Sequence, residues 1–479
     1  MRLLERGIWG LDTELKCKVS RKKGLFAKQM RKFRLTTTQI IMLSFMIVIL
    51  IGSVLLALPV SAAGGQAVPY VDALFTATTS VCVTGLVTLT TATAWSTFGQ
   101  IVILILIQIG GLGVITIISG FMISMHRKMG IGDRMLIQDA FNLNTLSGLT
   151  EFTGKVILGT FVIEGIGALL YMTVFVPQFG VRGIWISVFN AISAFCNAGM
   201  DIIGENSLCD YATRPVVNIV TSMLIILGGI GYIVWWDVVR VLKNIKAQGV
   251  RCFCYLTLHS KIALSVSVLL ILAGGVLILI FEYHNPLTLK NLAFFDKLQL
   301  AMFQSVSTRT AGFATLPQQN LTNASALLSI FLMFIGGSPV GTAGGVKTVT
   351  IAVLLVSAFA TIKGQNEVPL FGRNISKHSV SKAAAVVCMS FIILFLSTIL
   401  LAAVTDAPAL DIVYETVSAT ATVGLSRNLT PFLNIWGKLI IIVTMYLGRV
   451  GPISLAVALN RSKTIQNIIK SPTEEISVG

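Results

Sequence analysis

The sequence has few charged residues and few of the side chains on which enzymes depend. Only 12% of its 479 residues are charged, about half of the roughly 25% that is usual in a soluble domain. Its four histidines form no pair with the spacing of metal ligands or of a catalytic base and its nucleophile; they are His126, His259, His284 and His378. No glycine-rich nucleotide-binding motif follows a predicted strand. We therefore expect neither an enzyme nor an organic cofactor in this chain.

Long apolar runs are what the sequence has instead. Hydrophobic residues make up 54% of the chain, and a helix needs about 20 of them in succession to cross a membrane. An apolar run from 326 to 362 is longer than one span and is broken in its middle. Counting it once, we expect eight spanning segments. The other seven are Ile40–Val60, Phe98–Met125, Val156–Val176 (interrupted by Glu164), Val216–Trp236, Ile262–Phe281, Ala383–Val404 and Leu439–Leu459 (interrupted by Arg449).

Four shorter apolar stretches alternate with these spans, and each runs into a glycine. The glycines are 114, 113 and 112 residues apart, and a fixed internal period indicates a repeated architecture. Stretches of about 10–14 apolar residues are typical of re-entrant segments, and amphipathic connectors would not match four glycines in register. We therefore predict an all-α integral membrane protein with four helix–pore-loop–helix repeats, arranged pseudo-fourfold around one central ion pore. The short stretches are Pro69–Thr79, Ile184–Phe195, Phe294–Ser307 and Leu410–Thr420.

The basic residues set the predicted orientation. Eight spans place the lysine- and arginine-rich segments on one side, among them the first 37 residues with eleven Lys and Arg. Because cytoplasmic loops carry the basic excess, we expect a multi-pass plasma-membrane protein with both termini in the cytoplasm. This bias also explains the net charge of +16, so no nucleic-acid partner is expected. The predicted order is an arm at 1–37, repeats at 38–125, 150–245, 258–363 and 379–460, and a tail at 461–479.

The glycine turns have the properties of an ion filter. A dehydrating cation needs oxygen ligands in place of its water shell, and rings of backbone carbonyls supply them for potassium. Glycine readily takes the positive φ values that let neighbouring carbonyls point inward, while the side chains beside it vary. We expect potassium, as the transported substrate, to bind the backbone of Val83, Thr84, Gly85, Asn197, Ala198, Gly199, Thr310, Ala311, Gly312, Thr422, Val423 and Gly424.

With these four turns, the sequence resembles the Trk/Ktr/HKT superfamily of cation transporters over nearly all of the chain after the N-terminal arm. It is most similar to the membrane subunit of bacterial Ktr potassium uptake systems, since it lacks the additional N-terminal spans of Trk-type subunits. In that superfamily, glycine at all four filter positions goes with potassium selectivity. The resemblance implies potassium uptake by a homodimer docked on a cytosolic ring of Ktr- or Trk-type nucleotide-binding subunits. The alternative is a sodium-permeable or sodium-coupled member. A secondary transporter with discontinuous helices fits less well, because it would show two inverted repeats.

Each second helix carries a glycine motif, at 110–113, 228–231, 336–339 and 448–451. In repeats one and two, close helix packing is a sufficient explanation. In repeat three, five glycines and a proline fall within ten residues, and proline alone costs about 3 kcal/mol inside a helix. A kink needs only one such residue, so we expect an intramembrane loop, and similar segments gate conduction in Ktr and Trk subunits. The predicted gate residues are Gly336, Gly337, Ser338, Pro339, Gly341, Thr342, Gly344 and Gly345.

Three arginines and one glutamate complete the candidate site. Arg449 lies inside a span, where a charge costs at least about 2.5–3.5 kcal/mol, so it should face the pore as a gate residue below the filter. The competing interpretation is a structural ion pair between Arg449 and Glu164. Arg309 and Arg427 flank filter glycines, and we expect them to brace the filter loops through Glu415 or Asp201.

Overall fold

The computed structural model describes residues 36–125, 130–140, 148–243, 254–365 and 367–451. Most of the predicted arm at 1–37, the end of repeat four after 451, and the tail at 461–479 lie outside these ranges. The helices and strands of the described part are all helices apart from one two-stranded antiparallel hairpin, β1 (Pro369–Leu370) and β2 (Arg373–Asn374). The fold is therefore all-α, as predicted.

Four units of the same order follow one another along the chain. Each has a long outer helix, a short pore helix and an inner helix. The outer helices are α2 (Thr37–Ala57), α8 (Leu149–Phe179), α13 (Leu258–Glu282) and α17 (Lys377–Val404). The pore helices are α3 (Tyr70–Cys82), α9 (Val181–Cys196), α14 (Phe294–Ser307) and α18 (Ala409–Thr420). These short helices coincide with the four predicted re-entrant stretches.

The inner segments are less regular. They are α5 (Thr97–Leu112) with α6 (Val114–Ser124), α10 (Pro215–Ile230) with α11 (Tyr232–Leu242), α15 (Asn323–Phe334) with α16 (Thr348–Ile362), and α19 (Ile435–Val450). The remaining helices are α4 (Thr91–Ala94), α7 (Ile131–Ala140) and the 3-10 turns η2 (Pro59–Ser61), η3 (Cys209–Tyr211), η5 (Gln318–Asn320) and η6 (Thr430–Phe432).

The outer helices are the unbroken spans. All four are long and apolar enough to cross a membrane, and only 22–33% of their most apolar stretch is buried within the protein. The remaining apolar surface suits contact with lipid chains. Three of these helices begin at a hydroxyl residue that caps the first turn, since the side-chain oxygen accepts a backbone N–H three residues later. The capping residues are Thr36, Thr257 and Ser376.

The inner helices of repeats one and two are not the continuous spans that the sequence predicted. The chain turns by 92° between α5 and α6, at Gly113, and by 97° between α10 and α11, at Gly231. Their φ/ψ values of 85°/136° and 95°/140° belong to a region that is essentially restricted to glycine. Gly451 takes the same conformation at the end of α19 (91°/138°). The last glycine of the motif therefore ends the helix, beyond any role in packing.

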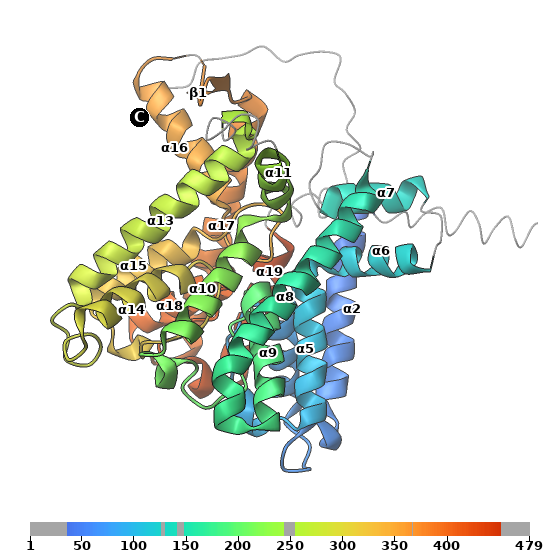
Figure 1. Cartoon of the computed structure of the whole chain (residues 1–479), viewed down its shortest axis with the longest axis vertical. Coiled ribbons are helices and arrows are strands. Elements are labelled where there is room, and N and C mark those ends of the chain that lie inside the picture. Colours follow the sequence, from blue (N-terminus) through green and yellow to red (C-terminus); the bar gives the residue numbers. More distant parts are fainter. Residues whose placement is uncertain (1–35, 126–129, 141–147, 244–253, 366, 452–479) are drawn as a thin grey trace, which may run out of the picture.

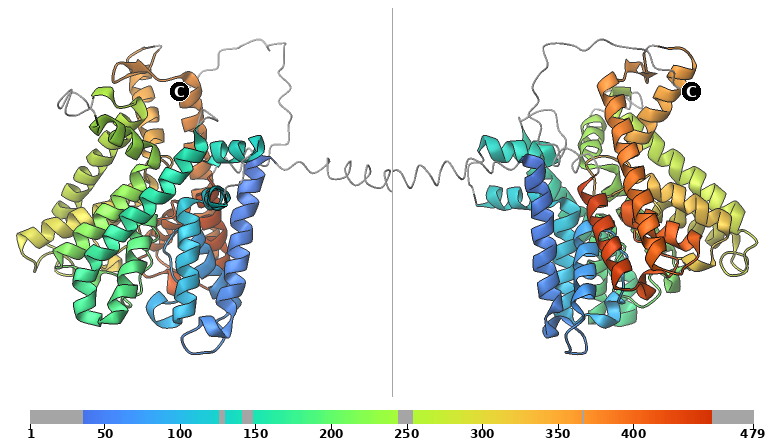
Figure 2. Two further views of the ribbon diagram at one scale, coloured as in Figure 1. Left: turned by 45° about the vertical axis from the view of Figure 1, so that its right-hand side comes forward. Right: turned by 180° about the vertical axis from the view of Figure 1, so that it is seen from behind.

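The units close into a ring. Each inner helix packs on the pore helix of the next unit, in the pairs α5 with α9, α10 with α14, α15 with α18, and finally α19 with α3. Figure 1 shows repeat one (α2, α5) and repeat three (α13, α15) on opposite sides, with α8–α10 in front. In the rear view of Figure 2, the orange and red helices of repeat four face the viewer. The pore helices lie at the centre of this pseudo-fourfold arrangement.

Candidate functional site

The four predicted filter turns meet in one ring. Each glycine faces the carbonyl oxygen of the residue just before the glycine of the next repeat. A Cβ added to the glycine would clash with that oxygen, so the backbones approach too closely for any side chain. The pairs are Gly85 with Ala198 (2.5 Å from the added Cβ), Gly199 with Ala311 (2.7 Å), Gly312 with Val423 (2.5 Å) and Gly424 with Thr84.

Each turn holds an unusual backbone conformation. The residue two positions before each glycine has a positive φ: Val83 54°, Asn197 60°, Thr310 65° and Thr422 50°. This left-handed conformation is rare for β-branched residues such as Val83 and Thr422, and conformations of this kind cluster at functional sites. The turns therefore hold their carbonyls in a geometry that an ordinary loop would not adopt.

Hydroxyl groups on the pore helices fix these turns, a feature that the sequence interpretation missed. Thr79 accepts the N–H of Gly85 at 3.0 Å, and Ser418 accepts that of Gly424 at 3.0 Å. Ser193 accepts the N–H of Met200 at 3.1 Å. The signal was present, because these hydroxyls stand six residues before their glycines in three repeats.

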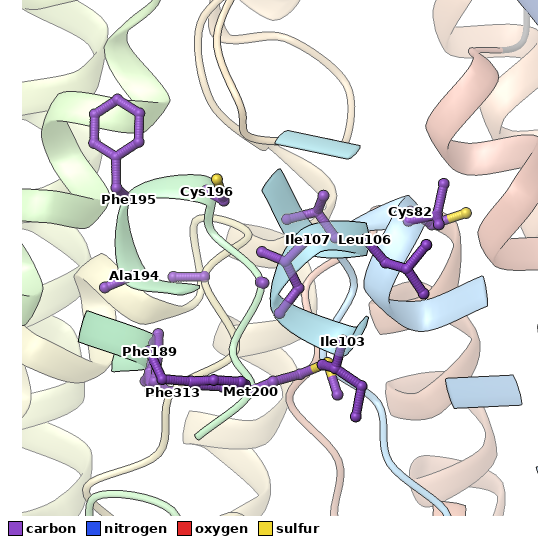
Figure 3. Close-up of a cluster of buried hydrophobic side chains, with 14 of the residues drawn as sticks. Cys82, Ile103, Leu106, Ile107, Phe189, Ala194, Phe195, Cys196, Met200 and Phe313 are labelled. Atoms are coloured by element: carbon purple, nitrogen blue, oxygen red, sulfur yellow. The ribbon is translucent and has the colours of Figure 1, made fainter. Parts of the chain in front are cut away.

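An apolar layer surrounds the ring. The residues directly after the filter glycines are buried; they are Leu86, Met200, Phe313 and Leu425. Figure 3 shows Met200 beside Phe189 and Phe313, with Cys196 just before the filter turn of repeat two. Within the described residues, Thr84, Asn197 and Thr422 in the turns keep buried polar side-chain atoms without a protein partner. Oxygen atoms of this kind suit a path for water and a dehydrating cation.

Repeat three contributes a non-helical loop beneath the ring. The loop, residues 335–347, joins α15 to α16, and we call it the gate loop. At its base, Gly336 donates to the Val346 carbonyl at 3.0 Å, so the two strands of the loop pair briefly. Its tip reaches the filter, where Gly344 donates to the Thr310 hydroxyl at 3.2 Å and the Thr342 hydroxyl donates to the Phe195 carbonyl at 3.0 Å. The predicted break is therefore present, and the gate loop lies directly against the filter.

The gate loop is also seated in the bend of repeat two. The ends of α10 and α11 leave backbone groups without partners inside a helix, and the loop supplies them. The bonds run from Ser338 N to Gly229 O at 2.8 Å, from Thr342 N to Gly228 O at 3.1 Å, and from Tyr232 N to Val340 O at 2.9 Å.

Arg449 joins the gate loop to two other repeats. Its guanidinium donates to the Thr342 carbonyl at 2.6 Å and also to the Gly110 carbonyl on α5. In the described part of the chain, Arg449 forms no ion pair with Glu164. Glu164 instead accepts the Gln108 amide at 3.2 Å. The structural ion pair considered from the sequence is therefore wrong.

Lys347 is a second cation at the gate loop, and the sequence interpretation gave it no role. Its ammonium donates to the Ala343 carbonyl at 2.5 Å and lies 3.5 Å from the Gly344 carbonyl. The carbonyls of two successive loop residues thus accept hydrogen bonds from cationic side chains. Thr342 accepts from Arg449 of repeat four, and Ala343 accepts from Lys347 of repeat three.

The two arginines flanking the filter brace it through other partners than predicted. Arg309 donates to the Ser267 carbonyl at 3.2 Å and to its hydroxyl at 3.1 Å. Arg427 pairs with Asp411 at 2.6 Å. Glu415, one of the predicted partners, accepts hydroxyls from Ser426 and Thr430. Bracing through Glu415 or Asp201 is therefore wrong.

A cavity of about 190 Å³ lies below the gate loop, between repeats one, two and four. Its walls include Phe45, Gly113, Tyr232, Gly341 and Arg449. The gate loop thus contacts the filter region through Gly344 and Thr342 and borders this cavity through Val340 and Gly341.

Comparisons with known proteins agree with this arrangement. A family model described as a cation transport protein (TrkH) matches residues 16–467. The potassium/sodium uptake protein NtpJ of Enterococcus hirae is 40% identical over 464 residues, covering 95% of this chain and 100% of that protein. The Ktr system potassium uptake protein B of Bacillus subtilis is 40% identical over 453 residues, covering 94% and 99%. The crystal structure of the potassium transporter TrkH from Vibrio parahaemolyticus superposes with a TM-score of 0.68 at 17% identity, covering 87% and 84%.

Proposed function

Since the chain belongs to the TrkH family of cation transport proteins, we propose that it takes up potassium across the plasma membrane through the ring of four glycine turns. One observation carries this proposal: each filter glycine faces a carbonyl of the next turn, all the way around the ring. Four turns from one chain can therefore surround a single ion with backbone oxygens.

The filter works by replacing water. A potassium ion loses its hydration shell only where carbonyl oxygens take its place. The pore helices add the partial negative charge of their C-terminal ends, and no more than two residues lie between each of these helices and its filter turn. The membrane potential supplies the driving force for uptake in this proposal.

The gate loop and Arg449 hold the path closed. The loop occupies the space directly under the filter, where Gly344 contacts Thr310. Arg449 holds the loop through Thr342, and its charge opposes a cation that leaves the filter. Opening requires the loop to leave this position. We assign control of that step to a cytosolic nucleotide-binding subunit bound to a homodimer of this chain.

Sodium transport is the second candidate, because the Enterococcus hirae relative is named a potassium/sodium uptake protein. The four filter glycines favour potassium over this second candidate.

Cation uptake into liposomes tests the proposal. The purified full chain is compared with a variant shortened within Ser338–Gly345, so that transport does not depend on a partner. We expect the shortened variant to take up rubidium, a potassium substitute, in preference to sodium and at a higher rate than the full chain. Uptake no greater than in empty liposomes would contradict the proposed function, and preferred sodium uptake would favour the second candidate.

A further inference from the structure

The bend in the inner helix of repeat two and the docked gate loop use the same backbone groups. In an uninterrupted helix, each N–H bonds to the carbonyl four residues earlier. Tyr232 would then donate to Gly228, and Ile233 would donate to Gly229. In the bent helix, the carbonyls of Gly228 and Gly229 and the N–H of Tyr232 are bonded to the gate loop instead.

The fit between loop and bend is close. A Cβ on Gly231 would clash with the carbonyl of Pro339, and a Cβ on Gly341 would lie 2.8 Å from the carbonyl of Gly228. Neither position therefore has room for a side chain while the loop is docked. The gate loop is therefore docked in the bend, and its backbone is in direct contact with the backbone of repeat two.

Repeat one shows that the bend does not by itself require this contact. Gly113 has nearly the same φ and ψ as Gly231. A Cβ on Gly113 would approach only the Thr116 hydroxyl, at 3.8 Å. The close backbone contact at Gly231 therefore belongs to the gate loop and not to bent inner helices in general.

We propose that Gly231 is a positioning residue for the gate, an inference that rests on the proposed function. With Gly231 bent, the gate loop is docked and the path is closed. When α10 and α11 join into a continuous helix, the loop is released. The two arrangements exclude each other, because the carbonyls of Gly228 and Gly229 and the N–H of Tyr232 serve only one of them at a time.

The exchange is close to balanced in hydrogen bonds. Undocking from the bend breaks three bonds, and the continuous helix forms two, from Tyr232 and Ile233. The loop's bonds to Thr310, Phe195 and Arg449 are exchanged for water when it leaves the filter. Of the loop groups left without a partner, the Val340 carbonyl belongs to a residue that lines the cavity, where water can bond to it. Because exchanging one hydrogen-bond partner for another has a small net effect, a modest force on the helix can shift the equilibrium.

The cytoplasmic part of α11 is where such a force can act. Asp237 accepts the N–H and the hydroxyl of Thr257 at 2.9 and 2.8 Å, which ties α11 to the start of α13. Arg240 and Lys243 follow at the end of α11 and are exposed. A cytosolic partner that binds these side chains could move α11 and thereby change the bend at Gly231, where the gate loop is docked.

The test measures basal rubidium uptake by the full chain in liposomes. The variant Gly231→Ala makes the bend unfavourable, because a Cβ strains this backbone conformation. The strain that a side chain causes in such a backbone conformation shifts an equilibrium roughly 5- to 30-fold. We therefore expect a clear rise in uptake. The matched control is Gly180→Ala, which also has a positive φ but has nothing within 4 Å of an added Cβ. Its uptake should equal that of the wild type.

A proline distinguishes helix continuity from a simple clash. Proline is tolerated in the first turn of a helix but not in its interior, so Ile233→Pro permits α11 and prevents a continuous α10–α11. In the otherwise wild-type chain, this substitution keeps the bend that the docked loop needs without adding a side chain at Gly231, so basal uptake should fall below the wild-type level. Hydrogen exchange at the amides of Ser338 and Thr342 should rise in Gly231→Ala and fall below the wild-type rate in Ile233→Pro.

Two results would overturn the inference. One is unchanged uptake in both Gly231→Ala and Gly341→Ala; the second variant disturbs the docked loop without straining the hinge and covers the case in which the first fails to fold. The other is a basal uptake in Ile233→Pro that is no lower than in the wild type. If the shortened gate loop raises uptake while these variants do not, the proposed gate is supported and the proposed role of Gly231 is contradicted. If the shortened loop has no effect either, the proposed gate itself is wrong.

Discussion

Lys438 on α19 donates to Asp72 on α3 at 2.5 Å, although 366 residues separate the two. Their side chains are only 16% and 11% exposed. The pair joins the last repeat to the first, at the contact where the ring of four units closes. Because a mostly buried carboxylate is costly to leave without its partner, this ion pair fixes the closed arrangement.

We predict that Lys438→Met destabilises the folded protein. The substitution keeps the length of the side chain and removes the charge opposite Asp72. Allowing for partial solvent screening, the loss should be about 1–3 kcal/mol, measured as a lower thermal unfolding midpoint in detergent. Lys155→Met is the matched control, since Lys155 pairs with Glu151 at 50% and 71% exposure and should change stability by less than about 0.5 kcal/mol. Equal effects of the two substitutions would contradict the role of Lys438 in closing the ring.

Serine at any filter glycine should weaken the preference for potassium over sodium. The variants that test this are Gly85→Ser, Gly199→Ser, Gly312→Ser and Gly424→Ser. Each added Cβ meets a carbonyl of the next turn, so the oxygen ring must shift. Competition between rubidium and sodium uptake in liposomes measures the effect. If all four variants keep the wild-type preference, these turns are not the filter.

Arg449→Ala should raise cation flux without lowering the yield of folded protein. The variant loses both the charge below the filter and the bond to Thr342, so the gate loop is held less firmly. Arg449→Lys should give an intermediate flux, because lysine keeps the charge but lacks the planar fork that reaches two carbonyls. Glu164→Gln serves as the control, since Glu164 bonds to Gln108. A loss of yield in Arg449→Ala with no gain in flux would indicate a purely structural role.

Lys347→Met should also raise flux. A hydrogen bond to a charged group contributes about 1.5–3 kcal/mol, so losing the Ala343 contact, which lies within the gate loop and holds its docked shape, should disfavour that shape roughly 10- to 100-fold. Lys363→Met, at the exposed other end of α16, should have no effect on flux. The double variant with Arg449→Ala should show less than the product of the two single effects, because both cations hold the same loop. Independent, multiplicative effects would argue against a shared target.

Much of this architecture could be predicted because its signals are local. The outer helices are continuous apolar runs, and the pore helices end at glycines with a regular period. The break in repeat three was evident from the density of glycine and proline between 336 and 345. Each of these features can be recognised from a stretch of consecutive residues.

The bends at Gly113 and Gly231 could not be predicted in the same way. A glycine in an apolar helix allows close packing as readily as a positive φ, and the structure uses both within one motif. Gly110 and Gly228 pack against pore-helix carbonyls, whereas the last glycine ends the helix. Side-chain partners were equally hidden, because Arg309 and Ser267 are 42 residues apart. Such pairs depend on how the helices assemble in space.

The gate loop explains why four repeats in one chain differ from four identical subunits. Within the described residues, one loop, from repeat three, lies beneath the ring; it is bonded to repeat two through Gly228 and to Arg449 from repeat four. In a symmetric tetramer, every such element would occur four times, and four loops would compete for the space on one axis. Fusion into one polypeptide lets each copy diverge, so that, in the proposed gate, one unit supplies the obstruction and its neighbours supply the residues that hold it. Asymmetry at the gate is thus compatible with near-symmetry at the filter only because the repeats are covalently joined.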